Sequence, residues 1–468
     1  MSRENWIQLA YLVAALGFAL SLKWMSAANT ARRGLFAGEI GFGIAIVATL
    51  FISGFTTTGY VLIAVALLIG SAIGVPLGLL VPMTAMPQRI ALSHSFGGLA
   101  AALVGIAHYY IVQPDVGKFD MAVLGVEVVL GCLVFTGSLM AAGKLQEVLP
   151  QRPIVYRGQN ASNFAILGVA LALVVVMVAS PGTSWIIPIL AVLGLVFGVL
   201  LIVPIGGADM PTVIALLNSY AGLSAAALGL VLDNKLLIVA GALDGTSGLI
   251  LAIIMCRAMN RSFRNVLFGA FGQADEEAVA AGAEVGNIRS ASPDEAAELL
   301  KAARLVIIVP GYGMAVAQAQ HRVRELADAL TKEGVDVRYA IHPVAGRMPG
   351  HMNVLLAEAN VPYEQLYDMD EINPEFPQAD VVLVLGANDV VNPSARHAKG
   401  SPIYGMPILD VDKAATVMVV KRSMRPGFAG IENELFYNPK TLMIFGDAKA
   451  VVSDLTSEVT GAKSAVSL

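Results

Sequence analysis

The sequence is poor in charged residues and in cysteine. Only 14% of its 468 residues are Asp, Glu, Lys or Arg, and 56% are hydrophobic, whereas about 25% charged residues is usual in soluble domains. This deficit excludes a purely soluble protein. The two cysteines, Cys132 and Cys256, lie in apolar runs. They offer neither a disulfide framework nor a CxxC metal site, and we expect no bound metal.

The few charges are unevenly placed along the chain. Residues 1–264 hold 13 Lys and Arg against 9 Asp and Glu, while residues 265–468 hold 17 against 26. The acidic second part lacks the basic surface that nucleic-acid binding requires. The division predicts a membrane domain over residues 1–260, a linker over 261–290 and a soluble domain over 291–468.

Long hydrophobic runs fill the first part. A bilayer core about 30 Å thick needs roughly 20 apolar residues in a helix. The first run is long and more spans follow it, so it is not a cleaved signal peptide. About nine predicted spans lie near residues 6–22, 35–54, 59–81, 89–111, 120–142, 162–180, 184–204, 210–231 and 236–257.

The Lys and Arg residues of short loops predict the orientation, because such residues stay on the cytoplasmic side. If the odd-numbered loops between spans lie on the cytoplasmic side, ten of these Lys and Arg residues lie there as well. Arg3, Lys118 and Lys235 then lie outside. We therefore expect the amino terminus outside and the acidic part in the cytoplasm.

Two ionisable residues inside the spans favour a proton route. His94, in Ser93-His94-Ser95 of the fourth span, can take and release a proton near neutral pH. Glu127 lies within the fifth span. Ionisable groups are costly in hydrocarbon, so their placement there indicates function.

Other polar residues of the spans leave two interpretations open. Ser138 and Asn218 could extend a hydrogen-bonded path to His94, or could simply hold helices together. Asp209 lies near a span end and Asp244 in mid-span, where each could conduct protons or brace the helices.

The second part alternates apolar strands with helices. Ser292-Pro293-Asp294-Glu295 has the pattern of a capped helix start. Such alternation predicts an α/β domain with a doubly wound parallel sheet, similar to a Rossmann fold. Strands are expected at 305–309, 335–341, 381–385, 416–420 and 441–445, and helices at 314–333, at 351–359 and after the last strand.

A glycine-rich turn follows the first of these strands. Its sequence is Gly311-Tyr312-Gly313-Met314-Ala315-Val316. Glycines there permit a tight turn and let the backbone approach a pyrophosphate. Val316 departs from the small third residue of the dinucleotide motif, so a plain turn is the alternative.

The choice between NAD and NADP depends on two segments. The second strand ends in Ala340-Ile341-His342-Pro343, without the acid that holds the ribose hydroxyls of NAD. Lys421-Arg422-Ser423 follows strand 416–420 and suits a 2′-phosphate. Solvated surface charge is the alternative, but together with the glycine turn these residues favour NADP.

Three further glycine-rich loops are expected at strand ends, where open sheets bind ligands. Arg347 lies in the first, which spans residues 342–351. The second is Gly386-Ala387-Asn388-Asp389, and the third spans residues 425–430 with Gly427 and Gly430. Of these residues, Arg347 and Asp389 are the ones we expect to touch the ligand.

Five ordered motifs resemble the beta subunit of the proton-translocating nicotinamide nucleotide transhydrogenases. His94 in Ser-His-Ser and Asn218 in Leu-Leu-Asn-Ser-Tyr extend the resemblance into the membrane part. The motifs are Gly311 to Ala317, His342 to Asn353, Gly386 to Pro393, Lys421 to Met424, and Phe445-Gly446-Asp447-Ala448-Lys449.

The resemblance implies a cytoplasmic domain that binds NADP(H) in an orientation reversed from the usual dinucleotide fold. The glycine turn, Arg347, Asp389, Asp447 and the Lys421-Arg422-Ser423 cluster would contact the nucleotide, and the loop from Gly427 to Gly430 would close over it. NAD(H) would lie on a separate alpha subunit. It further implies dimers of alpha–beta units, embedded in the lipid of a bacterial inner membrane, with protons moving inward.

Two other functions compete with this interpretation. One is a transporter or channel whose nucleotide domain senses redox state. The other is a membrane-anchored dehydrogenase, which would need a substrate pocket and a base besides the nucleotide site. The soluble part, about 200 residues long, has room for one domain.

Overall fold

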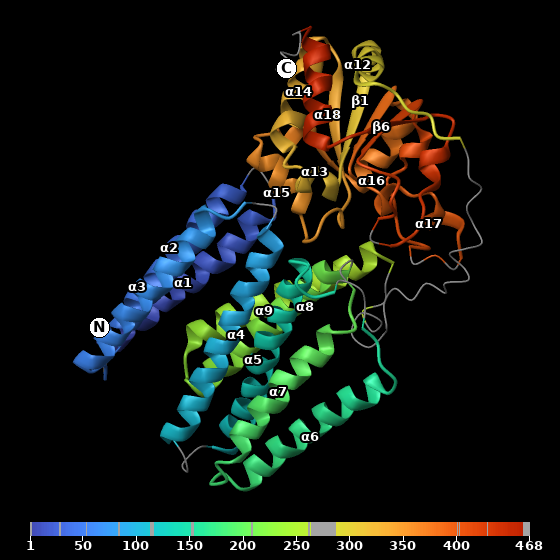
Figure 1. The fold of residues 1–468 in the computed structure, drawn as a ribbon. Coiled ribbons are helices and arrows are strands. Elements are labelled where there is room, and N and C mark those ends of the chain that lie inside the picture. Colours follow the sequence, from blue (N-terminus) through green and yellow to red (C-terminus); the bar gives the residue numbers. More distant parts are fainter. Residues whose placement is uncertain are drawn as a thin grey trace. The chain divides into compact units, whose positions relative to one another are not determined.

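The computed structural model describes residues 2–27, 30–52, 54–82, 85–112, 117–150, 154–206, 209–260, 263, 287–399, 401, 403–427 and 429–461. The chain divides into two compact units, residues 1–204 with 213–252, and residues 205–212 with 253–468. The first is helical and the second contains a sheet (Figure 1). Most of the predicted linker 261–290 lies outside the described residues, so the domain boundaries stay a prediction.

Apolar helices occupy all nine predicted spans within the described part of residues 2–260. Eight are long and apolar enough to cross a membrane, while α7, with 17 residues, is shorter. The predicted polytopic helical domain is therefore confirmed. The helices are α1 (Arg3–Met25), α2 (Ala31–Leu50), α3 (Thr57–Leu79), α4 (Met86–Val112), α5 (Lys118–Leu145), α6 (Gln159–Ala179), α7 (Ile186–Ile202), α8 (Met210–Val231) and α9 (Lys235–Ala258).

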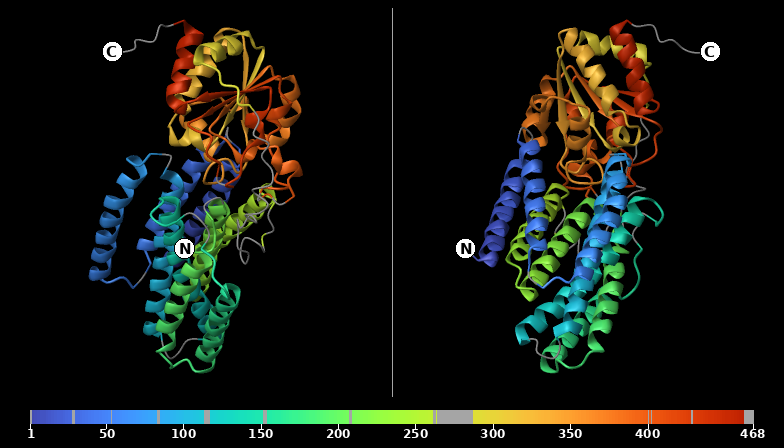
Figure 2. Two further views of the ribbon diagram at one scale, coloured as in Figure 1. Left: turned by 45° about the vertical axis from the view of Figure 1, so that its right-hand side comes forward. Right: turned by 90° about the vertical axis from the view of Figure 1, so that its left-hand side faces the viewer.

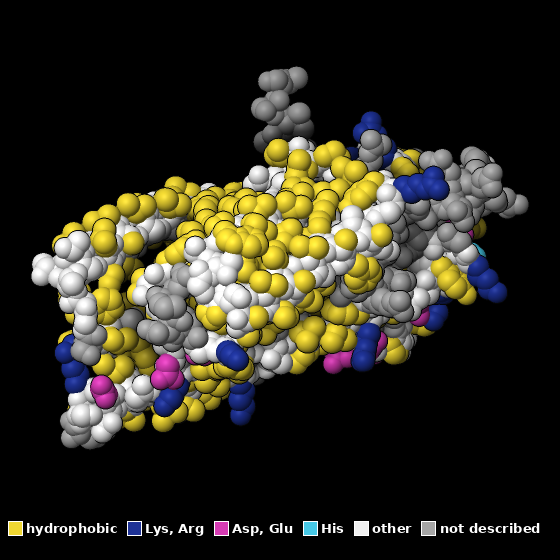
Figure 3. Space-filling model, turned by 90° about the horizontal axis from the view of Figure 1, so that it is seen from below, with side chains coloured by type: hydrophobic (Ala, Val, Ile, Leu, Met, Phe, Trp, Pro, Cys, Tyr) yellow, Lys and Arg dark blue, Asp and Glu magenta, His cyan; other side chains and the backbone are white. Residues whose placement is uncertain are grey.

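The outer surfaces of these helices are apolar. Leu68, Leu79 and Ile111 are 71%, 80% and 80% exposed. Hydrophobic side chains cover most of the face displayed in Figure 3, where charged side chains are sparse. Large exposed apolar surfaces of this kind suit a lipid environment rather than water.

Glycines bring neighbouring helices into backbone contact. A Cβ added to Gly98 of α4 would lie 2.8 Å from the carbonyl oxygen of Gly131 on α5. One added to Gly222 of α8 would lie 2.2 Å from the amide nitrogen of Gly245 on α9. Small residues therefore set the close approach of α4 to α5 and of α8 to α9, as is usual in membrane helix packing.

The second unit contains six parallel strands in the order β3-β2-β1-β4-β5-β6. This order is that of the doubly wound dinucleotide-binding fold, so the predicted α/β class is confirmed. The strands are β1 (Leu305–Pro310), β2 (Asp336–Ile341), β3 (Leu366–Asp368), β4 (Val381–Leu385), β5 (Thr416–Lys421) and β6 (Thr441–Phe445).

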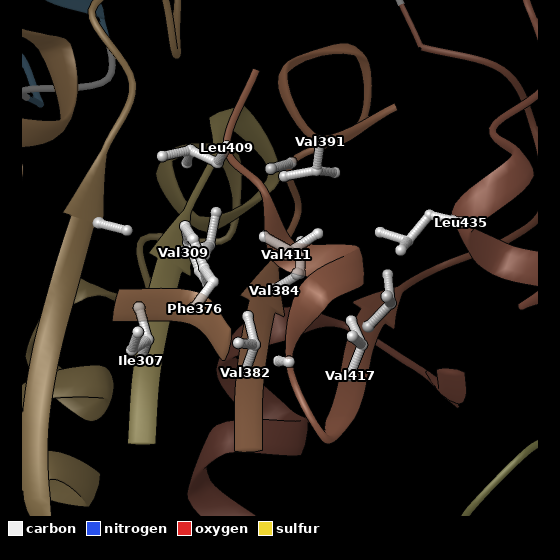
Figure 4. Close-up of a cluster of buried hydrophobic side chains, with 14 of the residues drawn as sticks. Ile307, Val309, Phe376, Val382, Val384, Val391, Leu409, Val411, Val417 and Leu435 are labelled. Carbon is white, nitrogen blue, oxygen red and sulfur yellow. The ribbon is translucent and has the colours of Figure 1, made fainter. Parts of the chain in front are cut away.

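Both faces of the sheet are covered (Figure 2). Helices α12 (Pro293–Ala302), α14 (Gln320–Lys332) and α18 (Ala448–Thr460) pack together. A separate apolar core joins alternate residues of the central strands, such as Val309, Val384 and Val417, to the short helical turns that contain Phe376 and Leu435 (Figure 4). Burial on both faces explains why these strands are almost wholly apolar.

Of two helices predicted from local sequence patterns, one begins as predicted and the other is interrupted. At α12 the predicted capping box forms, with Ser292 and Glu295 exchanging side-chain to backbone hydrogen bonds. The continuous helix predicted over 314–333 is wrong, because the chain forms α13 (Tyr312–Val316) and then α14. Gln318 between them has a φ of 48°, a left-handed conformation that interrupts a helix.

Most of the smaller elements were not predicted. Strand β3 has only three residues, too few to show a hydrophobic period. The short helices are α15 (His351–Glu358), α16 (Met369–Ile372), α17 (Ser394–His397), η3 (Tyr363–Gln365), η4 (Asn373–Gln378), η5 (Asp389–Val391), η6 (Val411–Lys413) and η7 (Glu434–Tyr437), of which only α15 was expected.

Candidate functional site

The carboxyl ends of β1 and β4 meet at the centre of the sheet. These strands are neighbours, and the strand order runs outward from them in both directions. The turn after β1 is bonded to the end of β4: the Gly311 amide donates to the Leu385 carbonyl and the Gly313 amide to the Gly386 carbonyl, each at 2.9 Å. Open sheets bind ligands where the strand order reverses in this way.

Glycine is required where the two turns touch. Gly386 has a φ of 67°, and a Cβ on it would lie 2.3 Å from the Cα of Gly313. No other residue fits this approach without moving the backbone. The structure thus brings the predicted turns 311–316 and 386–389 together as one surface.

Arg347 joins this surface through Tyr312. The guanidinium carbon lies 4.3 Å from the centre of the Tyr312 ring, within the range of a cation–π contact. Arg347 is only 6% exposed. Two residues predicted from separate segments are therefore in contact.

Lys421 is the last residue of β5, one position beyond the predicted strand end. Its ammonium group donates to the Arg425 carbonyl at 2.6 Å and lies 4.6 Å from the centre of the Phe436 ring. Burial lowers the pKa of Lys421. Arg422 and Ser423 follow it with exposed side chains.

The loop 425–430 is held against the turn 386–389. The Ala429 amide donates to Asp389 Oδ2 at 3.1 Å, and Asn433 Nδ2 donates to the Asn388 carbonyl at 3.0 Å. A Cβ on Gly427 would lie 2.7 Å from Asp389 Oδ1, so a larger residue there would displace the Asp389 side chain. Phe428 of this loop lies outside the described residues, and Gly430 is exposed.

Asn433 and Phe436 were not anticipated by the sequence analysis. Both lie beyond the glycine-rich loop, in an ordinary mixed segment without a motif. Only the fold shows that Asn433 reaches Asn388 and that Phe436 lies under Lys421.

Asp447 has a structural explanation. It follows the edge strand β6, and its Oδ1 accepts a hydrogen bond from the Lys449 amide at 3.0 Å at the start of α18. This is helix capping. The residue is exposed and lies two strands away from β4 in the sheet.

In the helical unit, three polar side chains from three helices meet. Asn218 of α8 donates to Asp244 Oδ1 of α9 at 3.1 Å. The same amide interacts with the His94 imidazole of α4, and Asp244 is close enough to act on that imidazole by its charge. The structure therefore brings His94 and Asn218 together and adds Asp244.

Glu127 forms a second buried polar contact. It is fully buried, and Ser224 of α8 donates to its Oε1 at 3.3 Å. A Cβ on Gly105 of α4 would lie 2.0 Å from the other carboxylate oxygen. Ser224, which the sequence analysis missed, is a common residue of membrane helices and carries no separate signal.

Ser138 and Asp209 are both buried, at 0% and 6% exposure. Among the residues that the structure describes, no hydrogen bond joins Ser138 or Glu127 to His94. Asp209 immediately precedes α8. In the same described ranges, no group of three or more His, Cys, Asp or Glu side chains could hold a metal ion.

Comparison with known proteins points to one family. A family model described as NAD(P) transhydrogenase beta subunit matches residues 7–458. Two relatives called NAD(P) transhydrogenase subunit beta, from Rhodospirillum rubrum and from a named strain of that species, are each 48% identical over 456 residues. The matched segment covers 95% of this chain and 97% of each relative.

Proposed function

This chain belongs to the NAD(P) transhydrogenase beta subunit family, and we propose that it is the NADP(H)-binding, proton-conducting subunit of such an enzyme. Hydride would pass from NADH, bound on a separate alpha subunit, to NADP⁺ on this chain. Protons would move inward across a bacterial inner membrane as this happens. The family itself implies use of nicotinamide nucleotides.

The observation that carries the nucleotide part of the proposal is the surface formed by Gly311, Gly313 and Gly386. It lies at the point where the strand order of the sheet reverses. Its glycines let the turn after β1 lie directly against the end of β4, at the edge where dinucleotide-binding sheets hold the diphosphate. The chain supplies this surface, and the nicotinamide ring supplies the hydride chemistry.

The position of Lys421 supports NADP over NAD. Lys421 is the last residue of β5, and Arg422 and Ser423 follow it. This strand lies on the far side of β4 from β1. A 2′-phosphate bound there would place the adenosine over β5, whereas the usual dinucleotide fold places it near the end of β2. The nucleotide would then run in the reversed direction that the resemblance implies.

The end of β2 agrees with this assignment. His342 follows Ile341 there, and its Nε2 is 2.8 Å from the Pro407 carbonyl. The imidazole is thus hydrogen-bonded to the protein backbone. No carboxylate stands at that position to hold the ribose hydroxyls of NAD.

The cluster of His94, Asn218 and Asp244 supports the proton part. Hydride exchange between two nicotinamide nucleotides is nearly isoenergetic, so it needs an outside driving force to acquire a direction. A proton crossing the membrane supplies about 2.3 kcal/mol per 100 mV. Protonation of His94, oriented by Asn218, would bias a two-state change that reaches the soluble domain and alters NADP(H) affinity.

The proposed division of labour follows the predicted domains. Residues 1–260 would conduct protons, residues 261–290 would transmit the change and residues 291–468 would bind NADP(H). Glu127, Ser138 and Asp209 would extend the proton route. The relatives' name, subunit beta, implies an alpha subunit, and we expect dimers of alpha–beta units.

The test compares sealed, energised vesicles with leaky ones, each containing this chain and its alpha subunit. With one proton per hydride, a potential of 100 mV should raise the final NADPH to NADP⁺ ratio about fiftyfold in sealed vesicles only. Equal final ratios in the two preparations would reject the coupling. The same preparation with His94→Ala should lose proton uptake.

A further inference from the structure

His351 is a buried histidine that the proposed function leaves without a role. It begins α15 and is 1% exposed. Its Nδ1 accepts a hydrogen bond from the Arg347 amide at 3.1 Å. The imidazole therefore fixes the backbone of the arginine that lies in the candidate nucleotide site.

The loop backbone is shaped to fit this imidazole. Gly346 has a φ of 106°, and a Cβ on it would lie 2.5 Å from His351 Nδ1. Both features require glycine. The residue before Arg347 thus has the conformation that lets His351 approach.

His351 also supports the ring that contacts the arginine side chain. The centres of the His351 and Tyr312 rings are 6.4 Å apart, with a tilt of 51° between their planes. The Arg347 guanidinium lies 4.3 Å from the centre of the same Tyr312 ring. Arg347 is therefore held twice, through its amide by His351 and through its guanidinium by Tyr312.

The imidazole is in the form that this arrangement requires. Burial, together with the nearby Arg347 charge, lowers the pKa of His351 to about 4. At neutral pH the ring is uncharged. With its one proton on Nε2, the ring keeps on Nδ1 the lone pair that accepts from the Arg347 amide.

We propose that His351 is a positioning residue that orients Arg347 toward a phosphate group of the bound dinucleotide. The role rests on the proposed function, since it presumes that a nucleotide occupies this edge of the sheet. Arginine binds phosphate best when its planar fork is already oriented. The phosphate is either the 2′-phosphate or the diphosphate, and the choice of ligand in the test separates them.

The experiment measures binding to the full chain in detergent by calorimetry. The ligands are NADP⁺ and adenosine 2′-monophosphate. His351→Asn keeps an acceptor near the position of Nδ1, whereas His351→Leu removes it at similar bulk. We expect the Leu variant to bind NADP⁺ about tenfold to a hundredfold more weakly, the range for hydrogen bonds near charged groups, and the Asn variant to stay within about threefold of wild type.

A double-mutant cycle shows whether the effect passes through Arg347. In an Arg347→Met chain, His351→Leu should cause no further loss of NADP⁺ affinity. Additive losses, or equal losses for the Asn and Leu variants, would overturn the proposal. A parallel loss for adenosine 2′-monophosphate assigns Arg347 to the 2′-phosphate, and a loss for NADP⁺ alone assigns it to the diphosphate.

Tyr312 provides a second route if His351→Leu does not fold. Tyr312→Phe keeps the ring beneath Arg347 and Tyr312→Leu removes it, so the Leu variant should bind NADP⁺ about tenfold more weakly than the Phe variant. Equal affinities for the two Tyr312 variants would also overturn the proposal. A wild-type chain that does not bind NADP⁺ would reject the proposed function itself, whereas normal wild-type binding with unaffected variants would reject only the positioning role.

Discussion

Asn218 on α8 donates from Nδ2 to Oδ1 of Asp244 on α9 at 3.1 Å, and the same amide faces His94 on α4. The helix backbone makes room for this contact, since a Cβ on Gly248 would lie 2.8 Å from Asn218 Nδ2. Three helices therefore share one polar cluster. A shift of any one of them changes the surroundings of the imidazole, which is what a proton-driven two-state change requires.

Replacing Asn218 tests the cluster directly. Asn218→Leu keeps the volume but leaves the Asp244 carboxylate without its donor. We expect proton-coupled turnover in sealed vesicles to fall at least tenfold, with a loss of stability of only about 1 kcal/mol, the net contribution of one hydrogen bond. Leu223→Ala, an exposed apolar position on the same helix, is the control and should keep full coupling.

Replacing Glu127 tests whether this residue conducts protons or only holds the helices together. Glu127→Gln retains the oxygen that accepts from Ser224 but cannot exchange a proton. If the carboxyl lies on the proton route, coupled turnover should fall about tenfold or more while folding stays normal. Turnover and proton uptake are measured together in sealed vesicles. Wild-type pumping by this variant would leave Glu127 with only a structural role.

A substitution at Gly105 tests Glu127 without replacing it, because it moves the carboxylate. A Cβ there would lie 2.0 Å from Oε2 of the carboxylate, so Gly105→Ala must displace the side chain. We expect the same loss of coupled turnover as for Glu127→Gln. The matched control is Gly97→Ala on the same helix, because a Cβ at Gly97 meets nothing within 4 Å.

The fold could be predicted where hydrophobic patterns are long. All nine apolar helices and five of the six strands appear near their predicted positions. The failures are local. Gln318 adopts a left-handed conformation that nothing in its sequence neighbourhood demands, and β3 is held by pairing with β2 rather than by a pattern of its own.

The candidate site could be predicted only as separate segments. Glycine turns, intramembrane acids and paired cations are visible in the sequence because each has a physical cost or a backbone requirement. Which of these residues lie close together in space depends on the fold. Nothing in the sequence places Arg347 over Tyr312, or Asn433 beside Asn388, since both pairs come from loops brought together by strand order.

Lys421 should control the choice between NADP and NAD. Lys421→Gln removes the point charge proposed to meet the 2′-phosphate, so NADP⁺ affinity should fall about tenfold to a hundredfold while NAD⁺ affinity changes little. Binding of both nucleotides to the full chain is measured at two salt concentrations. Arg322→Gln, an exposed cation on α14, should leave both affinities unchanged. Equal losses for NADP⁺ and NAD⁺ would contradict a 2′-phosphate contact.

The buried histidines should make the soluble unit sensitive to mild acid. Burial lowers the pKa of His342 from 6.5 to about 4. Between pH 6.5 and pH 4 the His342 imidazole binds a proton in the unfolded chain but not in the folded chain. Its contribution to the free energy of unfolding is therefore fully present above pH 6.5 and is lost as the pH drops toward 4. At pH 5 the loss from His342 is about 2 kcal/mol, and His351, with its pKa also lowered to about 4, adds a similar loss.

His342→Gln should be less stable at pH 7, because it loses the bonds to Pro407 and Val344, yet should lose about half as much stability between pH 7 and pH 5. Hydrogen exchange of the β1 and β4 amides in the full chain measures both quantities, with the exposed His321→Gln as the control. An unchanged pH dependence in His342→Gln would show that other groups set the acid sensitivity.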